Sequence, residues 1–306
     1  MNAFEALTGV AVRYLDAERL QAWRANYHGL RRKLVPVMRM LFGTFDASAL
    51  RDHLERRVGK DFEVLMVHSS INYMQPMYRD GPLELVRMLM DFCGPQRTLA
   101  MPAFYFGDAA TGGAFETLRQ QPRFDLKRAP SQMGIATELF RRSRGVVQSR
   151  HPFYRVAALG PLAAALTAGH ERAGTPSGRG TPFDFMANHD TLILGIGTRY
   201  DVLTQVHHAE DLMGDEFPVP GTPFQPLAVT VVDGTDEVRF DLAGRSLQWQ
   251  RDMWRLRSIM SGNELEEWRY HHVPMFKTRA RDVTAALISS AKRGITLYKA
   301  PRRLSA

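Results

Sequence analysis

Cysteine is almost absent from this sequence. The 306 residues include one cysteine, Cys93, so no disulfide can form within the chain. Small secreted proteins depend on disulfide frameworks, and a chain without one belongs more naturally in a reducing compartment. Cys93 follows Phe92 in an apolar run, and apolar neighbours raise the pKa of a thiol. We therefore expect Cys93 to be a core residue and not a nucleophile.

Long apolar runs are missing as well. The chain has no stretch of about twenty apolar residues that could cross a bilayer. Its first residues lack the basic start, apolar centre and small-residue cleavage site of a signal peptide. The sequence thus predicts a cytoplasmic protein without a membrane span. Internal repeats and a G-x-x-x-x-G-K-[ST] phosphate loop are also absent.

Acidic residues are fewer than basic ones. The sequence has 40 Lys and Arg and 32 Asp and Glu, which gives a formal net charge of +8. A basic balance invites nucleic-acid or membrane-surface binding. The positive excess, however, lies at the two ends of the chain, within 13–60 and 277–303. Between 182 and 216 acidic residues dominate, and Arg199 is the one cation. Nucleic-acid binding through the ends stays an alternative, although aromatic residues do not interleave with the arginines.

The length suffices for one large α/β domain or two smaller ones. Apolar spacing predicts a basic helical N-terminal extension (1–60), a core with the functional motifs (61–216), and a C-terminal hairpin and helix that complete the same domain (217–306). The elements expected from 61 onward are strands at 62–67, 97–104 and 191–197, helices at 82–93, 131–143, 161–170 and 204–214, a long surface loop at 105–130, a β-hairpin at 227–244, and a helix and strand at 278–299.

The densest cluster of ionisable groups lies in Thr191–Glu216. A buried strand, TLILGIG, is followed by a short helical pattern that ends at Gly214. On that helix His207, Glu210 and Asp211 share one face, so imidazole and carboxylate can meet. A carboxylate fixes the tautomer of a histidine and raises the basicity of its other nitrogen, as a general base requires. The place, beyond the carboxyl end of a strand, is where α/β sheets bind ligands.

Two other interpretations of this cluster stay open. A His-x-x-Glu pair on a helix is often only a surface ion pair. Zinc could use His207, His208, Glu210 and Asp211, but adjacent histidines diverge on a helix and the H-E-x-x-H spacing is absent.

Polar residues also stand at the ends of other elements. His68, Ser69 and Ser70 follow the strand at 62–67 and would leave backbone amides open to a ligand, or form a simple turn. Ser131 is expected to begin a helix, where anions are favoured. His151 precedes a proline, and a lone histidine of this kind is more often structural than catalytic.

Five segments, in this order, resemble motifs of the aminoglycoside 3-N-acetyltransferase family, within the antibiotic N-acetyltransferase superfamily. They extend from about Phe62 to Glu216. The segments are VHSSI, GPQRTLAMPAF, APSQMGIATELFRR, QSRHPFYRVAALGPLA and YDVLTQVHHAE. The resemblance implies the α/β fold of that family, with a mixed central sheet flanked by helices and a β-containing C-terminal subdomain, distinct from the GNAT fold.

The same resemblance implies a coenzyme A dependent N-acyltransferase. It assigns His207 as general base, Glu210 as the carboxylate that holds it, Asp201 and Thr204 as motif companions, and His151 as a histidine lining the site. Acetyl-CoA is the implied co-substrate, with no metal. The implied contacts of the coenzyme are His68, Ser69, Ser70, Ser131 and Ser149.

The chemistry agrees with the residues. An amine must lose a proton to attack a thioester, because an ammonium has no lone pair. A carboxylate-rich site attracts the cation and helps to remove the proton. We therefore expect an acidic hollow around His207, and direct transfer between two bound substrates.

Three positions depart from the family motifs. Arg155 stands where a small hydroxyl residue is usual, Arg97 replaces a glycine, and Ala103 replaces a threonine. If Arg155 faces the acceptor, it would repel a polycationic aminoglycoside. The expected acceptor is an amino group of an aminoglycoside or related aminosugar, and the alternative is an amine in polysaccharide or natural-product biosynthesis. Whether the protein is a monomer or a homodimer is left open.

Overall fold

The computed structural model describes residues 34–300. The chain forms two units, Met1–Thr44 and Phe45–Ala306. The described part of the first contains a helix over 34–42, and the sheets and cavities described below belong to the second. Within the predicted extension 1–60, residues 1–33 lie outside the described part, and helix α3 (Ala47–Arg57) belongs to the second unit.

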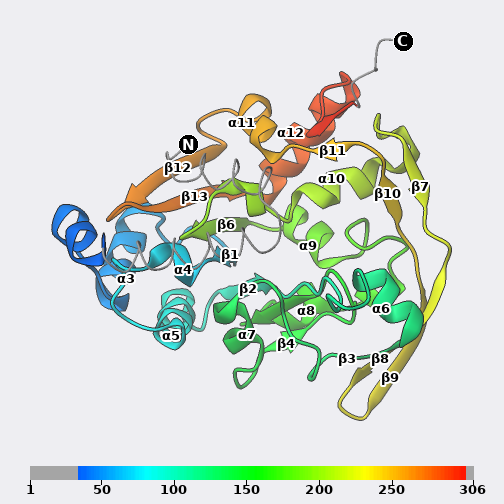
Figure 1. Cartoon of the computed structure of the whole chain (residues 1–306), viewed down its shortest axis with the longest axis horizontal. Helices are drawn as coiled ribbons and strands as arrows, with labels where there is room; N and C mark the ends of the chain where they lie inside the picture. Colours follow the sequence, from blue (N-terminus) through cyan, green and yellow to red (C-terminus); the bar gives the residue numbers. More distant parts are fainter. Residues whose placement is uncertain (1–33, 301–306) are drawn as a thin grey trace. The chain divides into compact units, whose positions relative to one another are not determined.

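A seven-stranded mixed sheet forms the centre of the second unit, in the order β12-β13-β6-β1-β2-β5-β4 (Figure 1). Strands β1, β2 and β6 are parallel, and the pairs towards both edges are antiparallel. The strands are β1 (Val64–Ser69), β2 (Thr98–Pro102), β4 (Val147–Gln148), β5 (Val156–Leu159), β6 (Thr191–Ile196), β12 (Leu265–Tyr270) and β13 (Val273–Arg279). The predicted mixed sheet is confirmed.

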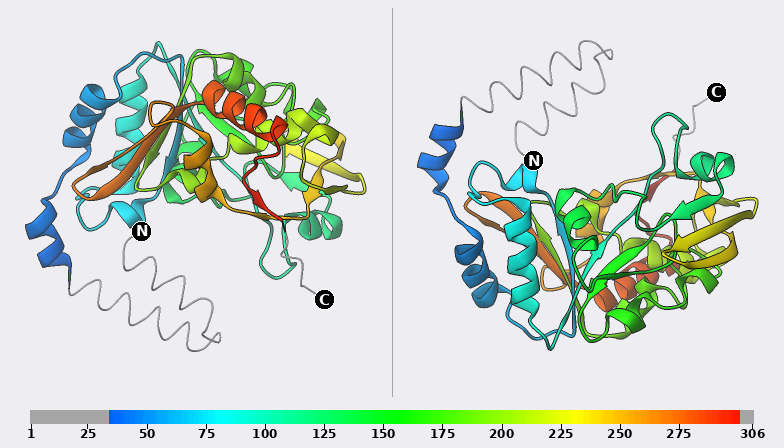
Figure 2. Two further views of the ribbon diagram at one scale, coloured as in Figure 1. Left: turned by 90° about the horizontal axis from the view of Figure 1, so that it is seen from above. Right: turned by 90° about the horizontal axis from the view of Figure 1, so that it is seen from below.

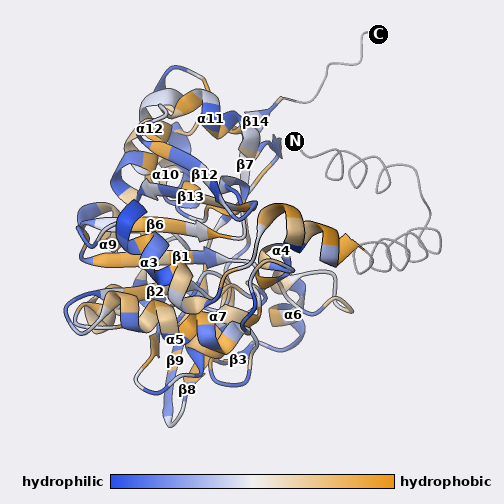
Figure 3. Ribbon diagram, turned by 90° about the vertical axis from the view of Figure 1, so that its left-hand side faces the viewer, coloured by the Kyte–Doolittle hydropathy of each residue, from blue (hydrophilic) through white to orange (hydrophobic). Residues whose placement is uncertain are grey.

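The three parallel strands are buried along almost their whole length. Continuous apolar runs, rather than alternating ones, are typical of strands covered on both faces. Figure 3 shows the apolar residues on β1 and β6. Two groups of helices provide the cover (Figure 2). One group is α5 (Pro82–Cys93) with α7 (Ile135–Arg141), and the other is α9 (Pro182–Asn188) and α10 (Val206–Met213) with α12 (Ala280–Lys292).

Glycine and proline set the ends of two important helices. Helix α5 (Pro82–Cys93) begins at a proline, which suits the first helical turn, and stops before Gly94 at φ 61°. Helix α10 (Val206–Met213) stops before Gly214 at φ 51°. Both predicted helices are confirmed, and Cys93 is buried as expected, with burial raising its thiol pKa to about 12.

A smaller three-stranded sheet is formed by β3 (Arg123–Asp125), β8 (Leu227–Asp233) and β9 (Asp236–Leu242). Strands β8 and β9 are the predicted hairpin. The prediction of a plain surface loop over 105–130 is wrong in part, since it contains β3 and helix α6 (Ala114–Gln120). Both form because their apolar side chains pack on β8.

Two short antiparallel pairs complete the chain. Strand β7 (Gly221–Pro223) pairs with β10 (Arg245–Leu247), and β11 (Gln250–Arg251) pairs with β14 (Tyr298–Lys299). The second pair sets Arg251 directly opposite Tyr298. The other helices are α4 (Ile71–Met74), α7 (Ile135–Arg141), α8 (Ala163–Thr167), α9 (Pro182–Asn188), α11 (Leu256–Ile259) and α12 (Ala280–Lys292). Within 34–300, the helices are too short or too polar to cross a membrane.

Candidate active site

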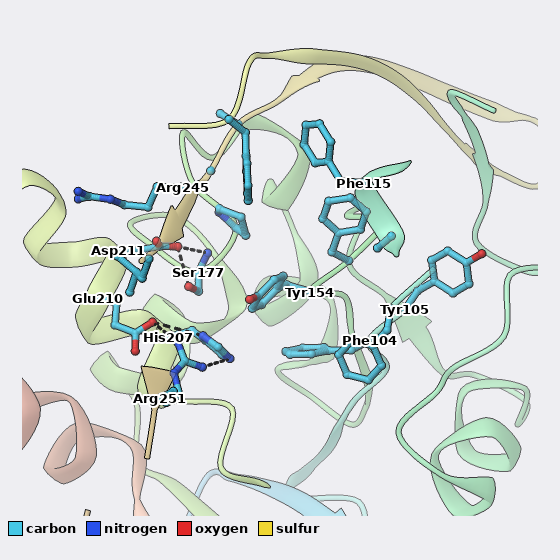
Figure 4. Close-up of a pocket in the computed structure, with 18 of the residues that line it drawn as sticks. Phe104, Tyr105, Phe115, Tyr154, Ser177, His207, Glu210, Asp211, Arg245 and Arg251 are labelled. Carbon is cyan, nitrogen blue, oxygen red and sulfur yellow. Dashed lines mark hydrogen bonds and ion pairs between the residues drawn. The ribbon is translucent and has the colours of Figure 1, made fainter. Parts of the chain in front are cut away.

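His207 and Glu210 are neighbours on α10, which follows β6 across a tight exit. Gly197 has a φ of 67°, and a Cβ atom there would lie 2.4 Å from the carbonyl oxygen of Ser70. Only glycine therefore lets the chain leave β6 so close to the end of β1. On α10, Nδ1 of His207 lies 3.5 Å from Oε2 of Glu210 (Figure 4). The side chains are 20% and 11% exposed, so the pair is not a solvated surface ion pair.

Arg251 and Tyr298 join this pair, and sequence reasoning missed both. Nη2 of Arg251 lies 2.5 Å from Oε2 of Glu210, and the Tyr298 hydroxyl donates to Oε1 of Glu210 at 3.0 Å. Nε of Arg251 also donates to the Tyr298 hydroxyl at 2.8 Å. Both oxygens of Glu210 are thus occupied. The two residues come from β11 and β14, far from α10 in sequence, and no spacing pattern connects them to it.

The network fixes the charge on Glu210. Burial alone would raise its pKa, but the hydrogen bond from His207 and the charge on Arg251 outweigh burial, so the pKa is lowered. Burial likewise works against the charge on Arg251, and Glu210 and Tyr298 outweigh it and raise the pKa of Arg251. Glu210 is therefore a carboxylate at neutral pH and Arg251 a cation.

The same network selects the tautomer of His207. Nη1 of Arg251 lies 3.2 Å from Nε2 of His207. A guanidinium can only donate, so Nε2 is the acceptor and the proton of the neutral ring is on Nδ1, facing Glu210. The ring of Tyr154 meets the imidazole edge-on, with centroids 5.1 Å apart. His207 thus carries its lone pair on the nitrogen that faces away from Glu210.

Two cavities meet at His207. The first, of about 670 Å³, is lined mainly by aromatic side chains together with Glu210 and Asp211. The second, of about 550 Å³, lies at the carboxyl ends of β1 and β6 and the start of α7. Four residues line both cavities: Phe104, Phe106, His207 and Arg251. The base candidate therefore stands in the wall between two ligand-sized hollows.

Most of the polar residues predicted for the site line the second cavity. His68, Ser69 and Ser70 reach it from the end of β1, and Asp201 and Thr204 from the segment before α10. Parallel strands bring their carboxyl ends to one edge of the sheet, and His68 is in register with Gly195 of β6. Burial lowers the pKa of His68 to about 4, so this imidazole is neutral at pH 7.

A family model described as aminoglycoside 3-N-acetyltransferase matches residues 66–290. The chain belongs to the aminoglycoside 3-N-acetyltransferase family. It is 32% identical to aminoglycoside N(3)-acetyltransferase IX of Micromonospora chalcea, over 50% of this chain and 57% of the relative. With aminoglycoside N(3)-acetyltransferase III of Serratia marcescens it shares 27% identity, over 59% of this chain and 68% of the relative. The chain thus spans about six tenths of the curated relatives it matches.

Solved structures agree with the family fold. A mutant of aminoglycoside acetyltransferase AAC(3)-IVa in complex with a gentamicin is 25% identical with a TM-score of 0.66, covering 84% of this chain and 92% of that one. AAC-IIIb in a binary complex with CoASH is 21% identical with a TM-score of 0.67, covering 84% and 100%. The predicted fold class of this family member is confirmed.

Three predicted site residues of this family member lie outside both cavities. His151 is buried, and its Nδ1 accepts hydrogen bonds from the N–H groups of Phe153 and Tyr154. The expectation that His151 lines the site is therefore corrected, because its ring holds the backbone of two residues that do line the first cavity. Ser149 is also buried, where its hydroxyl accepts from the Val156 N–H and bonds to His170.

Ser131 does not begin a helix. Helix α7 starts at Ile135 with Gly134 as N-cap, and the Ser131 hydroxyl accepts from the N–H of Met133 in a local turn. The prediction failed because a serine serves a turn as readily as a helix cap. The wall of the second cavity is formed instead by the residues that follow, from Gln132 to Thr137.

Arg155 does not face an acceptor. It is completely buried, and its guanidinium donates to the carbonyl oxygens of Ala103, Leu126, Ala129 and Pro130. The guanidinium thus ties the start of β5 to the end of β2 and to the segment between β3 and α7. The predicted repulsion of an acceptor by Arg155 is wrong, because the sequence could not show on which side of the strand this side chain packs.

The predicted excess of acidic residues around His207 is also wrong. Glu210 and Asp211 are the carboxylates in the described lining of the first cavity, and Arg245 and Arg251 match them in number. Asp211 Oδ2 accepts from the N–H and the hydroxyl of Ser177 at 2.8 and 2.6 Å. Asp201 lines the second cavity, and other acidic residues of 182–216 lie elsewhere, for example Asp190, which pairs with Arg279.

The four residues considered for zinc point to different partners. His208 donates from Nδ1 to the carbonyl oxygen of Ser177 at 2.6 Å, whereas His207 faces Glu210 and Asp211 binds Ser177. In the part of the chain that the structure describes, His, Cys, Asp and Glu do not gather in a group of three able to hold a metal ion.

Proposed function

We propose that this chain is a coenzyme A dependent N-acetyltransferase, which moves an acetyl group from acetyl-CoA to an amine by direct transfer with His207 as general base. The position of His207 in the wall shared by two cavities carries the proposal. A base in that place can serve an amine in one cavity that meets a thioester from the other. Family membership supports the same chemistry.

The second cavity suits the coenzyme. Both ring nitrogens of His68 and the hydroxyl of Ser69 are buried without a hydrogen-bond partner among the described residues. Buried polar atoms are almost always paired, so these three atoms indicate a ligand with polar groups. The amides of a pantetheine arm would supply partners. The second cavity also offers Ser70, Asp201 and Thr204 as further contacts.

In the proposed reaction, Nε2 of His207 takes the proton that the amine loses as its nitrogen bonds to the acyl carbon. The bond from that carbon to sulfur breaks, and the protonated imidazole gives this proton to the sulfur, so the coenzyme departs as a thiol. Glu210 stabilises the protonated imidazole, because it is held ionised by Arg251 and Tyr298. Arg251 now covers Nε2, so the amine takes the place of that one hydrogen bond while Arg251 keeps its pair with Glu210.

A covalent enzyme intermediate is not part of this proposal. Cys93 is buried in α5, and it does not line either cavity. Burial raises the pKa of its thiol to about 12, which leaves almost no thiolate at neutral pH. Holding both substrates on either side of His207 is sufficient for direct transfer.

The acceptor has two candidate classes. An aminoglycoside or related aminosugar is the acceptor that the family name suggests. An amine from polysaccharide or natural-product biosynthesis is the alternative.

Nucleic-acid binding is not favoured by the described basic residues. Lys277 pairs with Glu266, Arg279 with Asp190, and Lys60 with Glu55. Cations already paired with carboxylates offer little to a phosphate backbone. Arg51, Arg57, Arg281 and Lys299 also lie in ion pairs. Residues 1–33 and 301–306, which hold further basic residues of the two ends, lie outside the described residues.

Thiol release tests the proposal. The protein is incubated with acetyl-CoA and a panel of amines of different charge and shape, and free thiol is measured without and with each amine. We expect amine-dependent thiol release in equal amount to the N-acetylated product. Saturable acetyl-CoA binding without release by any amine would overturn the proposal, as would full activity that depends on added zinc.

A further inference from the structure

We infer that the first cavity takes a primary amine with a single positive charge on an aromatic or similarly flat apolar body, and not a polycationic aminosugar. The inference rests on the proposed N-acyl transfer and names the acceptor class of that same site. Two independent features of the cavity carry it: the rings that form its wall and the balance of its charges.

Aromatic rings from four separate segments form the wall. Phe104 packs against Tyr154 with centroids 4.6 Å apart, and Phe115 against Phe224 at 4.9 Å. The members of this aromatic wall are Phe104, Tyr105, Phe106, Phe115, Phe153, Tyr154 and Phe224. Figure 4 labels four of them: Phe104, Tyr105, Phe115 and Tyr154. The segments come from the end of β2, α6, the loop before β5 and the end of β7. Because segments that are far apart in the sequence meet at this cavity, the aromatic wall is a product of the tertiary fold and not of one local run of aromatic residues.

Two of these rings are unusually open. Phe106 is 57% exposed and Phe224 is 37% exposed, although both border a cavity of about 670 Å³. A phenyl ring left in water loses the free energy that burial would provide. Apolar hollows with a few polar groups are typical of sites for small apolar ligands. An aromatic acceptor would cover both rings and gain ring-to-ring contacts.

The charges of the described lining leave room for one cation. Glu210 uses both oxygens on Arg251 and Tyr298. Asp211 uses Oδ2 on Ser177, and its Oδ1 makes no hydrogen bond to a described residue. A single ammonium can therefore approach Asp211, one helical residue after Glu210 and close to His207 on the same face of α10.

Further ammonium groups would meet repulsion instead. Arg245 and Arg251 line the same cavity, and each is a permanent cation. An aminosugar with several ammonium groups would bring like charges towards these guanidinium groups. Its hydroxyl groups would also lose water against phenyl faces that cannot accept them as hydrogen-bond partners.

A comparison of two amines as acceptors tests the inference. The protein is assayed with saturating acetyl-CoA and either 2-phenylethylamine, which has one ammonium and one ring, or gentamicin. We expect kcat/KM to be at least about tenfold higher for 2-phenylethylamine. A higher kcat/KM for gentamicin would overturn the inference and leave the proposed function intact. Thiol release with other amines of the panel but with neither of these two would overturn the inference alone, and release with none of the panel would overturn both.

A variant pair locates the effect in the aromatic wall. Phe224→Ala removes an open ring of the first cavity, and Leu83→Ala is the control, because Leu83 is 38% exposed and lines neither cavity. We expect Phe224→Ala to raise KM for 2-phenylethylamine about tenfold while KM for acetyl-CoA and the Leu83→Ala kinetics stay unchanged. An unchanged amine KM in Phe224→Ala, or an equal rise in both variants, would contradict the aromatic wall as the acceptor site.

Discussion

Arg251 donates a hydrogen bond to Nε2 of His207, the nitrogen that the proposed reaction uses as base. Its other terminal nitrogen contacts Glu210. Arg251 therefore touches both the imidazole and the carboxylate that supports it, and occupies the position from which an amine would be deprotonated. The sequence motif of the family contains His207 and Glu210 but not this third member.

Removing Arg251 should change the pH dependence of acyl transfer. The pKa of Glu210 then rises from its present lowered value, because burial still raises it and the charge on Arg251 no longer adds to the hydrogen bond from His207 that lowers it. A protonated Glu210 cannot stabilise the imidazolium, so the acid limb of the kcat/KM profile should move to higher pH by about one unit in Arg251→Ala. Arg251→Lys keeps the charge and should shift it less. Superimposable profiles for all three proteins would show that Arg251 does not control Glu210.

Replacing His68 should weaken the binding of acetyl-CoA without lowering the stability of the fold. Its imidazole is buried without a partner, and burial lowers its pKa to about 4. Replacing it by leucine removes an unpaired polar group, so stability should stay equal or rise. The loss of a hydrogen bond to the coenzyme should raise KM for acetyl-CoA about tenfold. Thermal unfolding and steady-state kinetics on His68→Leu measure both, and a drop in stability with unchanged KM would refute the assignment.

Ser149 should behave as a structural residue. Its hydroxyl accepts from the Val156 N–H and bonds to Nδ1 of His170, in the interior. Ser149→Ala leaves both groups unpaired and should cost about 1–3 kcal/mol in the free energy of unfolding. KM for acetyl-CoA should not change. Denaturant unfolding and coenzyme kinetics together separate this role from the cofactor contact that the sequence suggested, which would show the reverse pattern.

Glu138 should stabilise the fold at neutral pH and lose that effect in acid. Burial opposes its ionised form, but hydrogen bonds from Arg141 and from the Ser131 N–H outweigh it and lower its pKa to about 2, from 4.5. A lowered pKa adds stability above the unfolded value, and the gain disappears as pH falls from 4.5 towards 2. Glu138→Gln should therefore cost about 2 kcal/mol at pH 7 and less at pH 3. Urea unfolding at both pH values checks this, and an equal cost at both would contradict it.

Local signals in the sequence predicted the parts of the structure that depend on local interactions. Pro82 and Gly94 bracket α5, and Gly214 ends α10, because these residues act through their own backbone. The meeting of His207 with Glu210 follows from their spacing on one helix.

Other features depend on tertiary contacts and could not be predicted. Arg251 and Tyr298 reach Glu210 through the pairing of β11 with β14, which are short and carry no apolar alternation. The burial of Arg155 depends on a carbonyl oxygen at the end of β2 and on three from the segment between β3 and α7, whose path the sequence does not specify. Counting acidic residues along 182–216 likewise could not show that two arginines from a distant segment enter the same cavity.

The central claim is that His207 removes the proton of the amine while the thioester is bound next to it. The most direct measurement is the single-turnover rate of acetyl transfer in His207→Ala, with acetyl-CoA binding followed by calorimetry on the same sample. Our account predicts a rate lower by about 10²–10⁴-fold, with acetyl-CoA affinity retained. A rate within twofold of the unaltered protein would contradict it.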